Sequence, residues 1–67
     1  MLDNTTTYIE FNNAYLSALE NGELSALQDE LKKLIDLYPR LYNANLFYAR
    51  CQVGLNNINK AIISYGS

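Results

Sequence analysis

Few residues of this chain have side chains that could carry out nucleophilic or acid–base chemistry. The sequence contains one cysteine, Cys51, and no histidine. Cysteine and serine nucleophiles commonly depend on a neighbouring histidine base, so the Cys-His and Ser-His arrangements are excluded. Cys51 shares a helical stripe with Ala44, Tyr48 and Leu55. We therefore interpret it as a buried structural thiol.

The acidic residues are also better explained without catalysis. Asp29, Glu30 and Asp36 fall on the polar side of a predicted amphipathic helix, where carboxylates favour solubility. The sequence has no glycine-rich phosphate-binding loop, and one thiol without histidine cannot supply the four ligands of a usual zinc site. We therefore expect no enzyme activity, no metal, no cofactor and no small-molecule substrate.

Composition and charge narrow the classes of partner. The 67 residues carry a net charge of −2, and their few basic side chains are scattered, so no surface for nucleic acid is expected. No apolar run approaches the roughly 18 residues of a membrane-spanning helix. The N-terminus lacks the basic and apolar regions of a signal peptide. Together with the unpaired cysteine, these features predict a cytoplasmic chain without a membrane partner.

Apolar residues spaced by three and four positions predict four helices. The first runs from about Thr6 or Thr7 to Glu20, and the second from about Leu24 to Leu37. The third runs from about Leu41 to Leu55, and the fourth from about Ile58 to Tyr65.

The predicted helix ends depend on turn and capping residues. Thr7 and Glu10 are spaced as a capping box at the start of the first helix, and Gly22 can end that helix in a left-handed conformation. Pro39 disfavours helical geometry at the residue before it and so ends the second helix. Gly54 and the following asparagines predict a turn between the third and fourth helices.

The turn positions recur after 34 residues, which is a period typical of helical repeats. At this shift Tyr8 falls on Tyr42, and residues 22–24 fall on residues 56–58. Residues 22–39, with a turn glycine, spaced leucines and a closing proline, resemble the second half of a tetratricopeptide (TPR) repeat. Residues 56–65 resemble a second copy of it. Leu27 departs from the alanine that the family prefers at its position.

The resemblance implies an all-α, TPR-like fold of antiparallel helical hairpins, with about four helices in two repeats. A single domain over residues 1–67 would contain one repeat at about 8–41 and a truncated one at about 42–67. In such a stack the first helix of each repeat lines a concave face that holds a partner. The residues assigned to this surface and to the exposed last helix are Asn12, Asn13, Leu16, Asn43, Leu46, Phe47, Arg50, Val53, Ile62 and Tyr65.

The function that this implies is protein–protein interaction. The groove would bind an apolar helical or extended segment of a partner, as in a small cytoplasmic chaperone or assembly factor; small TPR-like proteins include chaperones of type III secretion. A domain of this size without a disulfide, a metal or a polar capping helix is expected to associate with another protein, either a different chain or a second copy.

Two alternatives remain open. In the first, the same surfaces join copies of the chain into a self-assembling helical module. In the second, the chain is a plain four-helix bundle without a groove, and Leu46 and Phe47 are buried.

Overall fold

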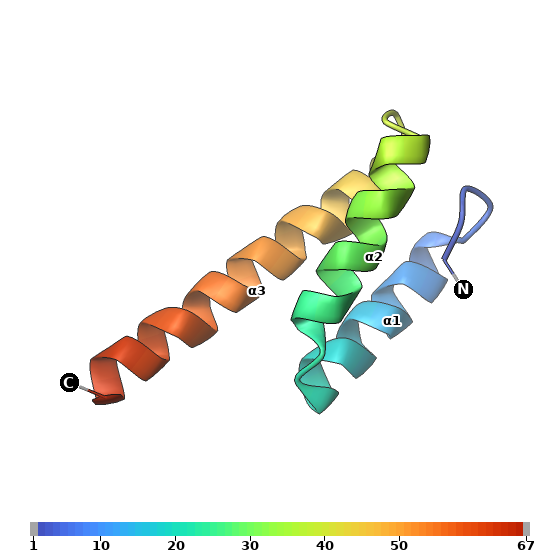
Figure 1. Ribbon diagram of the computed structural model, residues 1–67. Helices are drawn as coiled ribbons and strands as arrows, with labels where there is room; N and C mark the ends of the chain where they lie inside the picture. Colours follow the sequence, from blue (N-terminus) through green and yellow to red (C-terminus); the bar gives the residue numbers. More distant parts are fainter. Residues whose placement is uncertain (1, 67) are drawn as a thin grey trace.

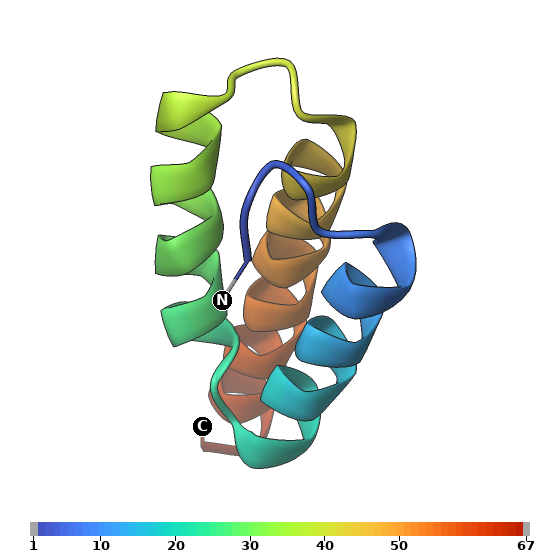
Figure 2. The ribbon, with the colours of Figure 1, turned by 90° about the vertical axis from the view of Figure 1, so that its right-hand side faces the viewer.

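The computed structural model describes the backbone of residues 2–66 and the side chains of residues 2–57. Three α-helices follow one another: α1 (Tyr8–Asn21), α2 (Leu24–Leu37) and α3 (Tyr42–Gly66). Consecutive helices run in opposite directions, so that α1 and α3 run the same way and both pack against α2 (Figures 1 and 2). The all-α prediction is confirmed.

The ends of α1 have the structure that the sequence predicts. At the N-terminus, the Glu10 backbone N–H donates to Thr7 Oγ1 at 3.3 Å, and the Thr7 N–H donates to Glu10 Oε1 at 3.1 Å. This reciprocal pair satisfies two N–H groups that have no acceptor within the helix. At the C-terminus, Gly22 has a φ of 72°, a left-handed conformation that glycine adopts without a Cβ penalty.

The segment before α1 is held by the side chain of Asp3. Asp3 Oδ1 accepts hydrogen bonds from the Thr5 hydroxyl at 2.7 Å and from the Thr5 N–H at 2.8 Å, and these bonds lower the pKa of Asp3. The resulting turn places Leu2 against the core, beside α2.

The leucine stripe of α2 forms the centre of the core. Leu24, Leu27, Leu31 and Leu34 are all buried, as their spacing predicts. The helix ends at Leu37, before Pro39, and the Tyr38 N–H donates to the Leu34 carbonyl at 2.8 Å.

The other two helices each contribute buried residues to this core. Phe11 and Ala18 come from α1, and Ala44, Phe47 and Cys51 from α3. Burial raises the pKa of the Cys51 thiol, because the thiolate would lose its solvation. The predicted burial of Cys51 is confirmed.

The predicted turn at Gly54 and the separate fourth helix are wrong, because α3 continues without a break to Gly66. A Cβ atom at Gly54 would lie 3.0 Å from Leu24 Cδ1 and 3.8 Å from the Tyr15 hydroxyl. Because glycine has no Cβ, it allows α3 to approach α1 and α2 closely at this position, and its backbone remains helical. The asparagines that follow cost a helix only a few tenths of a kcal/mol each.

The continuous α3 changes the shape of the molecule. Its 25 residues span about 38 Å, whereas the 14 residues of α1 or α2 span about 21 Å. The C-terminal part of α3 consequently extends beyond the other two helices (Figure 1). The structure contains three packed helices and shows no repeat, so the arrangement of two TPR-like hairpins is not observed.

Candidate functional site

An aromatic cluster joins α1 to α3, with Phe47 at its centre. The ring centroids of Tyr8, Phe11 and Tyr15 lie 5.3, 5.8 and 6.0 Å from that of Phe47. The three α1 residues are spaced by three and four positions, so they share the side of α1 that faces α3. Ring pairs at these distances stabilise a core beyond the area that they bury.

The position of Phe47 corrects one predicted partner-binding residue. Its side chain is 0% exposed, because the aromatic residues of α1 pack over it. The sequence contained a signal for this burial, since Ala44, Phe47 and Cys51 follow the three-and-four spacing of a buried stripe. Phe47 therefore holds the helices together and does not present a surface to a partner.

Arg50 lies next to this cluster, half-buried between α1 and α3. Its guanidinium carbon is 4.9 Å from the centroid of the Phe47 ring and 6.0 Å from that of Tyr8. Nη1 donates a hydrogen bond of 3.4 Å to the Tyr8 hydroxyl. The aromatic faces attract the cation and favour a guanidinium that lies over the rings.

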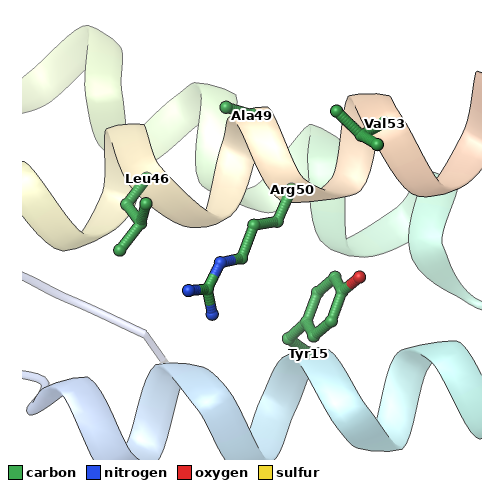
Figure 3. Close-up of a pocket in the computed structure, with 5 residues that line it drawn as sticks. All are labelled: Tyr15, Leu46, Ala49, Arg50 and Val53. Atoms are coloured by element: carbon green, nitrogen blue, oxygen red, sulfur yellow. The ribbon is translucent and has the colours of Figure 1, made fainter.

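An open groove of about 460 Å³ runs between α1 and α3 beside Arg50. We call it the α1/α3 groove, and its lining residues are Tyr15, Leu46, Ala49, Arg50 and Val53. Figure 3 shows Arg50 extending from α3 towards α1, and Tyr15 rising from α1 into the same space. Most of the lining is apolar, and Arg50 is its one charged residue.

Three residues predicted for partner binding line this groove together, namely Leu46, Arg50 and Val53. Tyr15 and Ala49 also line it but were not predicted. Tyr15 belongs to the apolar stripe of α1 and is half-buried against the core, whereas Ala49 is exposed. The helical spacing that Ala49 shares with Leu46 and Val53 is the signal that could have identified it.

The other predicted residues surround the groove or lie outside the described side chains. Asn12 and Asn43 are half-buried, whereas Asn13 and Leu16 are exposed. Ile62 and Tyr65 fall in the part of α3 whose side chains the structure does not describe.

The apolar surface extends from the groove onto the outer sides of both helices. Leu19 follows Tyr15 by four residues, and Tyr42 precedes Leu46 by four, so each lies on the groove side of its helix. The adjoining strip of α1 contains Ile9, Leu16 and Glu20, spaced by seven and four residues. Ile9 is 70% exposed, Tyr42 72% and Val53 59%. We call the groove and the residues around it the α1/α3 face: Ile9, Asn12, Asn13, Leu16, Leu19, Glu20, Tyr42 and Asn43.

A second apolar hollow, of about 400 Å³, lies at the connection between α2 and α3. Leu37, which is 73% exposed, lines it together with Tyr38 and Pro39. It is separate from the α1/α3 groove, so Leu37 provides a matched exposed apolar position outside that face.

The described residues offer neither a metal site nor a membrane span. Among them, no group of three or more carboxylate or thiol side chains comes together in a way that could hold a metal ion. In this part of the chain, no helix combines the length and the apolar character needed to cross a bilayer.

No protein-family model, curated protein or solved structure matches the chain. The fold defines the class, a small all-helical protein of three packed helices, and no family is identified.

Proposed function

We propose that this chain is a protein-interaction module whose α1/α3 face binds the apolar side of a helix from a partner chain. The observation that carries the proposal is the α1/α3 groove, an open and mainly apolar channel between two helices. Grooves of this kind accept amphipathic helices through apolar residues spaced by three, four and seven positions.

The exposed residues of the α1/α3 face support the same role. Ile9, Leu16, Tyr42 and Val53 are large apolar side chains that are 51–72% exposed, and their helical spacing places them around the groove. Exposed apolar residues that cluster in this way commonly mark an interaction site. Binding would remove these side chains from water without any catalytic step, as in a small chaperone or an assembly factor.

The plain-bundle alternative predicts that Phe47 and Leu46 are both buried in the core, and the structure agrees with this for Phe47 only. Phe47 is fully buried, whereas Leu46 is half-buried and lines the groove. Substitution of Phe47 would consequently report on folding, and Val53 is the better residue for testing binding.

Photo-crosslinking in cells tests the proposal, because it captures a partner whatever its identity. p-Benzoylphenylalanine at position 53 is expected to give discrete protein adducts, because this position lies in the groove. The same group at position 37 is the matched control, since Leu37 is exposed, apolar and outside the α1/α3 face.

The masses of the adducts separate the possible partners. An adduct of twice the mass of the chain would identify a second copy, and other masses would identify different proteins. Absence of adducts at position 53, or equal adducts at positions 53 and 37, would contradict a specific binding role for the α1/α3 face.

A further inference from the structure

The segment before α1 forms its hydrogen bonds within itself. Asp3 Oδ1 accepts hydrogen bonds from the Thr5 N–H, the Thr5 hydroxyl and the Thr6 hydroxyl, at 2.8, 2.7 and 3.2 Å. Thr6 Oγ1 accepts one from the Asp3 N–H at 2.8 Å, and the Thr6 N–H donates to the Asp3 carbonyl at 3.3 Å. Among the described residues, these bonds close one turn without joining it to α2 or α3. We call residues 2–6 the N-terminal strap.

The strap packs on the helices through Leu2, its one large apolar residue. Leu2 is half-buried and lines a hollow of about 120 Å³ together with Leu34 and Leu37 of α2. Asn4 borders the larger hollow at the connection between α2 and α3, which Leu37 also lines. Figure 2 shows the segment turning back from the start of α1 towards α2. The strap therefore lies along the C-terminal end of α2 and borders both hollows there.

We propose that the N-terminal strap opens and closes as one unit over the end of α2 while the three helices remain packed. Opening uncovers the side of Leu34 and joins the two hollows at Leu37, where they already meet. This conformational device goes beyond the proposed function, because Leu34 and Leu37 lie outside the α1/α3 face.

The division of contacts between the strap and the helices carries the inference. The hydrogen bonds of the Asp3 turn move with the strap, so its opening need not break them. Its apolar hold on α2 is one half-buried leucine, whereas the core contains buried side chains from all three helices. Segments with few buried apolar contacts open far more often than the whole domain unfolds. Opening of the strap therefore does not require the helices to separate.

Amide hydrogen exchange measured by NMR tests the proposal from the side of Leu2. In the native chain, the Thr5 and Thr6 N–H groups are expected to exchange about tenfold more slowly than in an unstructured peptide. Leu2→Asp is expected to abolish this protection, although Leu2 forms none of the bonds of the turn. The amide of Leu31, in the middle of α2, should keep its native exchange rate.

The reciprocal experiment starts from the turn and reads out α2. Asp3→Ala removes the acceptor that holds the turn together, and Asp3 does not line the hollow at Leu34. A soluble nitroxide is expected to cause a loss of intensity in the Leu34 methyl signals of this variant but not of the native chain. Ile9→Asp is the control, because it places a charge at an exposed apolar residue of α1 outside the strap. It should leave the Thr5 amide and the Leu34 methyl signals unchanged.

Each outcome decides for or against a strap that opens as a unit. Unprotected Thr5 and Thr6 amides in the native chain overturn it, as does protection that survives Leu2→Asp. Loss of Leu31 protection or of helix content in Leu2→Asp would show that strap and helices open together, and this also overturns it. Asp3→Ala gives an independent decision, because Asp3 is exposed, and Leu34 signals that stay insensitive to the nitroxide would contradict the coupling between the turn and α2.

Discussion

Phe47 and Val53 are six residues apart on α3, but substitutions at these positions should have different consequences. Phe47 is fully buried among the aromatic rings of α1, and Val53 is 59% exposed at the groove. A buried ring contributes to the stability of the folded chain, whereas an exposed valine has most of its surface in water. The first position therefore tests the core and the second tests the surface.

Phe47→Ala is expected to reduce the free energy of unfolding by about 3–5 kcal/mol, because it removes a buried ring and leaves a cavity. A domain of 67 residues has a total stability of roughly 3–10 kcal/mol, so the variant should be largely or marginally unfolded at room temperature. Urea denaturation followed by circular dichroism measures the loss. Phe47→Leu, which keeps much of the apolar volume, is the control and should remain folded. A loss below about 1 kcal/mol for Phe47→Ala would show that the aromatic cluster does not hold α1 to α3.

At the scale of the helix, Gly54 sets how closely α3 approaches the start of α2. The added methyl group of Gly54→Ala would meet Leu24 Cδ1 at 3.0 Å, and Leu24 is only 2% exposed and has little room to move. Alanine favours a helix over glycine by about 1 kcal/mol, but here we expect this gain to be cancelled and the variant to be less stable than the native chain.

The control for this prediction lies two residues further along the same helix. Asn56 is exposed, so Asn56→Ala should raise the free energy of unfolding by a few tenths of a kcal/mol through helix propensity alone. Urea denaturation of the two variants compares them directly. If Gly54→Ala stabilised the chain as much as Asn56→Ala does, or more, the close contact with Leu24 would be wrong.

Local signals explain which helices could be predicted from the sequence. The capping box at Thr7 and the left-handed Gly22 act within a few residues, so α1 and its ends were predictable. The leucine stripe and Pro39 gave α2 its correct bounds. The role of Gly54 depends on Leu24, which is distant in sequence, and a local pattern cannot distinguish a glycine that ends a helix from one that admits a neighbour.

The same limit applies to the candidate site. Leu46, Arg50 and Val53 share one side of a helix, so their spacing placed them together correctly. Phe47 occupies the adjacent side, and its burial depends on the aromatic residues of α1. The spacing of Phe47 with Ala44 and Cys51 is compatible with burial, but it is the tertiary packing of α1 that decides which side of α3 is covered.

At the scale of the whole molecule, the core is small and has no covalent reinforcement. Cys51 is a free thiol, and the buried residues amount to a few side chains from each helix. Domains of this size usually gain stability from a disulfide, a metal or association. We propose association through the exposed apolar residues of the α1/α3 face as the source of this additional stability.

If copies of the chain associate through the α1/α3 face, as in the self-assembling alternative, the melting temperature must depend on protein concentration, because dilution favours dissociated and unfolded chains. For a domain of this size, 1 kcal/mol shifts the melting temperature by about 4–8 °C. A hundredfold increase in concentration changes the free energy by about 1.4 kcal/mol per chain, which corresponds to a rise of roughly 5–10 °C.

Val53→Asp supplies the comparison for this measurement. A charge in the groove should abolish such self-association while α1, α2 and α3 remain packed, so the melting temperature of this variant should not change with concentration. At high dilution the melting temperatures of Val53→Asp and of the native chain should become similar, because both chains are then monomers with the same core. Thermal melts followed by circular dichroism over the same concentration range measure both chains. A native melting temperature that is independent of concentration would mean that the three-helix monomer is stable by itself, with its apolar face left exposed to water.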